Sequence, residues 1–240
     1  MTGFKWFPSA FAGPDQLRIL IRLGRVTEIA DGFFLTGGTA LAAFYLGHRT
    51  SEDLDFFTIE TRDLSEIIFL VARIWPEETA LIRKGDGFAS VLVRGVKIDF
   101  VCDPLSQPGA RDRARLDEGA YVAVDSIANI ASNKLTTLIA RTELKDFLDF
   151  YFISRAFPDL DRERTFKEAR AKERMFEDPA SAAYQVEIGA SSLRRHLGEA
   201  RENTGGNRGI VLPGLIKPVD GPEFWRFYED LAGWLYEKER

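Results

Sequence analysis

The chain has 240 residues, of which 45% are hydrophobic and 29% are charged, a composition typical of a globular protein with a substantial core. No apolar run approaches the roughly 20 residues of a membrane helix. The first residues, interrupted by Pro8 and Pro14, do not resemble a secretory signal, so we expect a cytoplasmic protein without a membrane segment. The net charge of −5 argues against a broad nucleic-acid-binding face, and with one cysteine and two histidines any metal must be bound mainly by carboxylates.

The first half of the chain alternates predicted helices and strands. Apolar residues at helical spacing predict a helix over 15–29, and a β-prone run at 33–35 leads through a glycine pair into a helix over 39–46. The segment 103–113, which contains two prolines, is predicted to be a loop. The other predicted elements are a strand at 53–58, a helix over 64–74, strands at 79–83, 88–93 and 96–101, the last two forming a hairpin, and a short strand at 121–124.

The second half is predicted to be helical. Two helices are expected over 126–141 and 143–155, and the last helix, over 223–239, presents aromatic residues at a spacing typical of a core or a subunit contact. The sequence therefore predicts an α/β (α+β) fold in which a mixed sheet with flanking helices, residues 1–125, precedes a helical C-terminal region, residues 126–240.

Two aspartates, Asp53 and Asp55, are separated by one residue in the second predicted strand. Side chains at i and i+2 of a strand lie on the same face, about 6.6 Å apart. Adjacent like charges cost stability unless a cation lies between them, and carboxylate oxygens suit Mg²⁺ or Mn²⁺. The pair is therefore a candidate metal site.

A glycine turn, Gly37-Gly38, precedes this acidic strand. A strand that turns through two glycines into a helix presents backbone N–H groups to an anion, and Thr39 adds a hydroxyl. A phosphate at the turn and a metal on the acidic strand together describe a nucleoside triphosphate (NTP) with Mg²⁺. Neither motif is specific alone, but their order and separation favour this interpretation.

The pattern resembles the nucleotidyltransferase superfamily and, more closely, the AbiEii/AbiGii toxins of type IV toxin–antitoxin and abortive-infection systems. The resemblance covers roughly residues 15–155. The motifs that carry it are FLTGGTAL at 34–41, HRTS at 48–51, DLDFF at 53–57, Asn133-Lys134-Leu135, Arg141 and KDFLDFY at 145–151.

The resemblance implies a nucleotidyltransferase fold and transfer of a nucleotide from an NTP to a hydroxyl of an RNA (tRNA) or a protein. It also implies that Asp53, Asp55 and Asp99 bind Mg²⁺ or Mn²⁺, with Asp99 as the third carboxylate. Asp99 is independently notable, because an acid between Ile98 and Phe100 on an interior strand is costly to bury without a charged partner. The alternative is that Asp99 faces solvent from an edge strand.

The resemblance also assigns the remaining candidate site residues. Lys134 and Asp146 are implied to be catalytic, whereas a solvated, salt-bridged pair of helices is the alternative for this block. Arg49 and Ser51, just before the acidic strand, are placed to reach the same phosphate as the glycine turn. The predicted nucleotide-binding residues are Gly37, Gly38, Thr39, Arg49 and Ser51.

The resemblance also implies a role in toxin–antitoxin and phage-defence systems. A cognate antitoxin that acts without forming a tight complex is the expected partner. Two other functions stay open: a non-catalytic nucleotide-binding interaction protein of the same fold, and a drug-modifying nucleotidyltransferase that acts on a small molecule.

Overall fold

The chain forms two compact units, Met1–Ile130 (the N-terminal unit) and Ala131–Arg240 (the C-terminal unit). The division lies within helix α5 (Ile127–Ala140), a few residues after the predicted boundary at 125. No helix in the described part of the chain is long and apolar enough to cross a membrane. The computed structural model describes residues 4–106, 111–140, 142–175, 190–203 and 210–239.

The N-terminal unit contains a mixed seven-stranded sheet. Its strands are β1 (Phe34–Thr36), β2 (Leu54–Thr58), β3 (Thr79–Gly85), β4 (Phe88–Val93), β5 (Val96–Cys102), β6 (Asp112–Asp117) and β7 (Ala120–Val124). They are ordered β3-β4-β5-β2-β1-β7-β6. Strand β1 pairs antiparallel with β2 and parallel with β7, and β2 pairs parallel with β5. The mixed sheet confirms the predicted fold class, and β4 and β5 form the predicted antiparallel hairpin.

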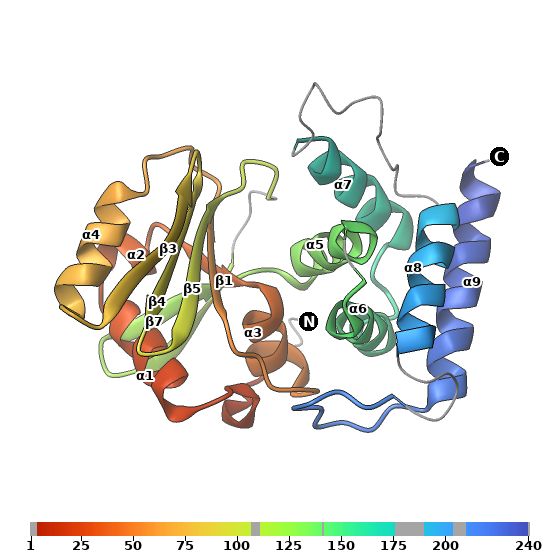
Figure 1. Ribbon diagram of the computed structural model, residues 1–240, viewed down its shortest axis with the longest axis horizontal. Coiled ribbons are helices and arrows are strands. Elements are labelled where there is room, and N and C mark those ends of the chain that lie inside the picture. Colours follow the sequence, from red (N-terminus) through yellow and green to blue (C-terminus); the bar gives the residue numbers. More distant parts are fainter. Residues whose placement is uncertain (1–3, 107–110, 141, 176–189, 204–209, 240) are drawn as a thin grey trace. The chain divides into compact units, whose positions relative to one another are not determined.

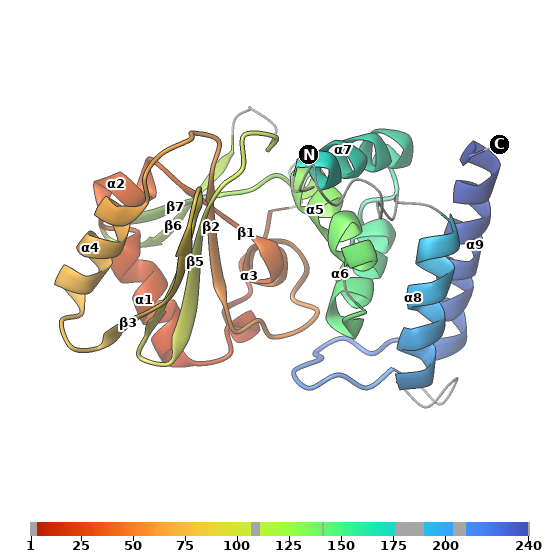
Figure 2. The ribbon, with the colours of Figure 1, turned by 45° about the horizontal axis from the view of Figure 1, so that its top comes forward.

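Helices cover both faces of this sheet. They are η1 (Pro8–Ala10), α1 (Pro14–Leu23), α2 (Thr27–Ala30), α3 (Gly37–Leu41), the π-helical segment η2 (Ala42–Leu46) and α4 (Ser65–Ile74). Figures 1 and 2 show α1, α2 and α4 on one face and α3 on the other. All three residues of β1 are buried, so this central strand is covered on both faces. Leu35 lies in register with the buried Phe56 of β2, and Phe56 with the buried Phe100 of β5. Strand β1 therefore passes into α3 within the interior of the unit.

Two sequence predictions in this unit are wrong. The single helix predicted over 15–29 is two helices, because α1 ends before Gly24, whose backbone lies against Tyr121 and accepts its N–H at 2.9 Å. Part of the predicted loop over 103–113 belongs to β6, which pairs antiparallel with β7. Strand β6 is mostly polar and lies at the sheet edge, so it lacks the apolar run that marks an interior strand.

The C-terminal unit is helical and has its own aromatic core. Its helices after α5 are α6 (Leu144–Ala156), α7 (Arg162–Met175), α8 (Ala190–Asn203) and α9 (Gly221–Glu239). Side chains at helical spacing on α9, including Trp225, Tyr228 and Leu231, are almost fully buried. Phe147 of α6 packs edge-to-face against Tyr228, with ring centroids 5.1 Å apart. The predicted core role of this last helix is confirmed.

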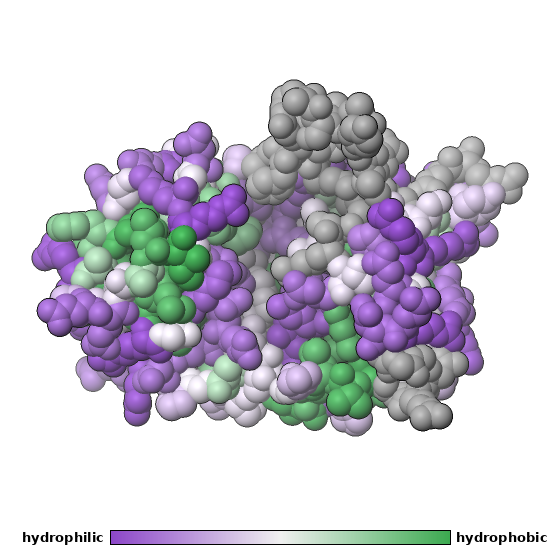
Figure 3. All heavy atoms as spheres, in the orientation of Figure 1, coloured by the Kyte–Doolittle hydropathy of each residue, from purple (hydrophilic) through white to green (hydrophobic). Residues whose placement is uncertain are grey.

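One edge of the N-terminal sheet has an exposed apolar surface. Figure 3 shows hydrophobic side chains gathered over α4 and β3, which contribute the exposed residues Phe69, Leu81 and Ile82. Strand β3 is the edge strand, its register shifts between Leu81 and Arg83, and Lys84 lies near its end. A bulge and basic residues discourage pairing of an edge strand with another chain.

Candidate active site

The sheet register brings two of the predicted acids together. In the parallel pairing of β2 and β5, Asp55 lies directly opposite Asp99, and in the antiparallel pairing of β1 and β2 it lies opposite Thr36. Asp53 directly precedes β2, and its side chain is 44% exposed whereas that of Asp99 is 13% exposed. The acids therefore lie where an interior strand opens toward solvent.

Lys97 contributes a positive charge among these acids. Its Nζ lies 2.6 Å from Oδ2 of Asp99 and 4.0 Å from Oδ2 of Asp53. The Ser90 hydroxyl donates to the other oxygen of Asp99 at 2.5 Å. Burial lowers the pKa of Lys97, but the hydrogen bond to Asp99 and the charges of Asp99, Asp53 and Asp55 outweigh this effect and raise the pKa above its usual value. Lys97 is therefore a protonated counter-ion of the acidic group.

The acidic group fits a divalent cation by the chemistry of its donors. Within the described ranges, no three or more His, Cys, Asp or Glu side chains are already arranged to hold a metal ion. Carboxylate oxygens are nevertheless the ligands that Mg²⁺ and Mn²⁺ prefer, and the ammonium of Lys97 lies at the same carboxylates as a stand-in cation. Binding of a metal by Asp53, Asp55 and Asp99 stays a prediction.

The glycine turn lies against the acidic strand on one side and against two polar side chains on the other. Gly37 has φ +69°, and a Cβ added to it would lie 2.1 Å from Oδ2 of Asp55. A Cβ added to Gly38 would lie 2.6 Å from Nη2 of Arg49 and 2.8 Å from Oγ of Ser51. Four of the predicted nucleotide-binding residues thus meet at one place, next to a predicted metal ligand.

Thr39, the fifth predicted nucleotide-binding residue, is fully buried. Its hydroxyl donates to the backbone carbonyl of Asp53, and Nε2 of Gln16 donates to the same carbonyl at 3.1 Å. Thr39 therefore ties α3, which begins with the glycine pair, to the residue that directly precedes β2. A contact of Thr39 with phosphate stays a prediction.

Lys134 and Asp146 form a buried ion pair within the C-terminal unit. Nζ of Lys134 lies 2.9 Å from Asp146 and 2.6 Å from Asp149, and these side chains are 8%, 0% and 0% exposed. The alternative of a solvated pair of helices is wrong for these three residues. The alternative is correct for Lys145, whose exposed side chain pairs with the exposed Glu143. Arg141 lies outside the described residues. A catalytic role for Lys134 and Asp146 stays a prediction.

Replacing Gly37 with alanine is expected to destabilise the fold by about 1–3 kcal/mol and to weaken nucleotide binding. The cost arises because an L-residue is strained at φ +69° and because its Cβ would collide with Asp55. Gly119→Ala is a matched control, since Gly119 has φ +68° and open space around the added Cβ. Urea unfolding of both variants separates the collision from the backbone strain, and equal losses would contradict a specific role for the contact with Asp55.

Sequence reasoning missed Lys97 and Gln16, which both contact residues of the predicted site. Lys97 lies two residues before Asp99, so the two-residue period of a strand places both side chains on one face. That spacing could have identified Lys97 from the sequence. Gln16 is 2% exposed, and it also donates to the Thr39 hydroxyl at 3.3 Å. No local pattern connects Gln16 with residues so far along the chain.

Comparison with known proteins gives one family and several structures of the same fold. The sequence matches the family described as "Nucleotidyl transferase AbiEii toxin, Type IV TA system" over residues 18–203. It is 33% identical over 149 residues to an uncharacterized protein of Aquifex aeolicus (strain VF5). That match covers 59% of this chain and 65% of the relative, so it spans less than two thirds of the relative's length.

Two solved structures share the fold over nearly the whole chain. JHP933 from Helicobacter pylori aligns with a TM-score of 0.54 and 17% identity, covering 98% of this chain and 94% of that one. MenT4, a nucleotidyltransferase toxin from Mycobacterium tuberculosis H37Rv, aligns with a TM-score of 0.51 and 15% identity, covering 92% of this chain and 91% of that one. At such identities the likeness establishes the fold, and the family follows from the sequence match over more than half of the chain. This protein belongs to the AbiEii nucleotidyl transferase toxins of type IV toxin–antitoxin systems.

Proposed function

We propose that this chain transfers a nucleotide from an NTP to an acceptor hydroxyl, with Mg²⁺ or Mn²⁺ bound by Asp53, Asp55 and Asp99. The observation that carries the proposal is the position of Asp55, which lies beside Asp99 in the sheet and against Gly37 of the glycine turn. A cation-binding group and a candidate phosphate-binding turn are therefore in contact. An NTP with its divalent cation is the substrate that matches both.

In this proposal the protein groups divide the work between binding and proton transfer. The backbone amides of Gly37 and Gly38, with Arg49 and Ser51, bind the triphosphate oxygens. Asp99 accepts the proton of the acceptor hydroxyl. The oxygen of that hydroxyl bonds to the α-phosphorus as the bond to pyrophosphate breaks. The divalent metal, when bound, stabilises negative charge on the phosphate oxygens. For Lys134 and Asp146 a catalytic role rests on the family resemblance alone.

We further propose that the acceptor is an RNA, such as a tRNA. Membership of a toxin family favours a macromolecular acceptor over a small molecule. The test is incubation with Mg²⁺ and NTP labelled at either the α- or the γ-phosphate, scored on RNA, protein and small hydroxyl compounds. Transfer of the α-label to RNA, with the γ-label released in pyrophosphate, is the expected result.

Each other outcome of this labelling identifies a different function. Transfer of the γ-label would show phosphoryl rather than nucleotidyl transfer. An α-label on protein, or on a small molecule as in a drug-modifying enzyme, would replace RNA as the acceptor. NTP binding without transfer to any acceptor would favour a non-catalytic interaction protein.

The family also suggests a setting in the cell. We propose a cytoplasmic toxin of a phage-defence system, counteracted by an antitoxin that does not form a tight complex with it. Co-expression with the product of a neighbouring gene should restore growth of cells that make the toxin, while the two proteins should not co-purify. Co-purification of a stable complex would contradict this mode of neutralisation.

Replacing Lys97 with methionine is expected to strengthen Mn²⁺ binding by up to about fivefold. The ammonium lies at Asp99 and near Asp53, so a metal must compete with it, and a partly exposed ion pair is worth at most ~1 kcal/mol. Lys84→Met is a matched control, because Lys84 is equally exposed at 40% and pairs with Asp63. Titration with Mn²⁺ alone measures the effect, and unchanged or weaker binding would show that Lys97 does not compete.

A further inference from the structure

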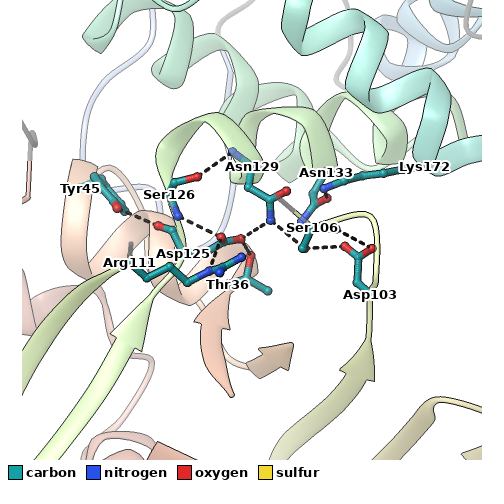
Figure 4. Close-up of polar contacts among 10 residues, drawn as sticks. All are labelled: Thr36, Tyr45, Asp103, Ser106, Arg111, Asp125, Ser126, Asn129, Asn133 and Lys172. Atoms are coloured by element: carbon teal, nitrogen blue, oxygen red, sulfur yellow. Dashed lines mark hydrogen bonds and ion pairs between the residues drawn. The ribbon is translucent and has the colours of Figure 1, made fainter. Parts of the chain in front are cut away.

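Asp125, the residue after β7, is a fully buried acid surrounded by hydrogen-bond donors (Figure 4). Its Oδ2 accepts the Thr36 hydroxyl at 2.7 Å and the Asn129 side-chain amide at 2.6 Å. Its Oδ1 accepts the Ser126 N–H at 2.9 Å and the Arg111 guanidinium at 3.2 Å. Because donors of the protein satisfy both oxygens, this acid has the environment of a structural anchor rather than of a metal ligand.

The position of Asp125 in the sheet mirrors that of Asp55. Strand β1 lies between β2 and β7, and Thr36, its last residue, lies opposite Asp55 of β2. On the other side Leu35 lies opposite Val124, and the Asp125 N–H donates to the Leu35 carbonyl at 2.9 Å. Thr36 is therefore flanked by an acid on each side at the point where β1 enters the glycine turn.

Asp125 also holds the far end of the segment that contains the turn. The Tyr45 hydroxyl, in η2, donates to the backbone carbonyl of Asp125 at 2.7 Å. Burial, together with the charges of Asp112 and Asp125, raises the pKa of Tyr45 well above its usual value, so the phenol remains a donor. The Asp125 side chain and carbonyl thus bind residues 36 and 45, on either side of Gly37 and Gly38.

The same network extends to the strand that carries Asp99. The Asn129 amide also donates to the Ser106 hydroxyl at 3.0 Å, and this hydroxyl donates to Asp103 at 2.7 Å, as Figure 4 shows. Asp103 directly follows β5, and its N–H donates to the Thr58 carbonyl of β2 at 2.7 Å. The ends of β1, β2, β5 and β7 are therefore connected through buried polar groups.

We propose that Asp125 is a positioning residue that holds the Gly37-Gly38 turn in the conformation that binds the phosphates of the nucleotide. This inference rests on the proposed nucleotidyl transfer for its functional part, whereas its structural part concerns the turn alone. Removing the bond between Thr36 and Asp125 should release the turn without removing any group that touches nucleotide. Loss of a hydrogen bond to a charged group shifts such a local equilibrium by about tenfold.

The primary test uses Thr36→Val, which keeps the shape of the side chain and removes only the hydroxyl. Amide hydrogen exchange of residues 37–41 is expected to accelerate about tenfold, and the KM for NTP to rise by a similar factor with a smaller change in kcat. Thr36→Ser should restore both, and Tyr45→Phe should act in the same direction from the other end of the segment. Thr58→Val is the matched control, because Thr58 is 2% exposed, as buried as Thr36, and its hydroxyl accepts the Glu60 N–H at 3.2 Å rather than bonding to Asp125.

The two readouts separate failure of this inference from failure of the proposed function. Unchanged exchange in Thr36→Val would overturn the positioning role, whether or not the wild type binds NTP. Faster exchange with unchanged KM and kcat would show that the turn does not bind the nucleotide and would also overturn the inference. A wild type without NTP binding, but with faster exchange in Thr36→Val, would contradict the proposed function while supporting the structural role of Asp125.

Discussion

Nucleotidyl transfer is expected to fall at least about a thousandfold when Asp55 or Asp99 is replaced with asparagine. The amide keeps the shape of the side chain but removes the charge that binds a cation, and a thousandfold corresponds to ~4 kcal/mol of transition-state stabilisation. Asp53→Asn should act in the same direction. The rate is measured with α-labelled NTP at saturating Mg²⁺.

These substitutions should leave the fold intact, because they reduce the repulsion between adjacent negative charges. Asp117→Asn is a suitable control, since this strand aspartate is 54% exposed and pairs with Arg25 on the same unit, outside the acidic group. We expect all four variants to unfold within about 1 kcal/mol of the wild type. Transfer that survives both Asp53→Asn and Asp99→Asn would refute metal catalysis at this site.

The acidic strand and the glycine turn were predictable because their signals are local. A two-residue period places Asp53 and Asp55 on one face, and a glycine pair between β-prone and helix-forming residues marks a turn. The structure adds the register, in which Asp55 lies beside both Asp99 and Thr36. This register depends on strands that are distant in sequence.

Asp125 shows why the rest of the site could not be predicted. Its role depends on the parallel pairing of β1 with β7, two strands separated by most of the N-terminal unit. In the sequence it is one more acid at the start of a predicted helix, typical of a capping residue. Strand β6 was missed for a related reason. It is a mostly polar edge strand, so its pairing with β7, rather than an apolar run in its own sequence, defines it as a strand.

In the C-terminal unit, Lys134→Met is expected to destabilise the fold by about 3–5 kcal/mol, because two buried carboxylates lose the ammonium that they share. Lys145→Met, on the adjacent helix, removes an exposed pair with Glu143 and should cost less than about 1 kcal/mol.

Restoring charge balance should recover much of the lost stability. Adding Asp146→Asn and Asp149→Asn to Lys134→Met removes the two buried negative charges and is expected to return part of the 3–5 kcal/mol, as measured by urea unfolding. A triple variant that regains stability but not transfer would assign this buried group, rather than Lys134 alone, to the reaction as well as to the fold. Conversely, a Lys134→Met protein as stable as the wild type would contradict the structural role, because two buried carboxylates that lose a shared ammonium are expected to destabilise the fold.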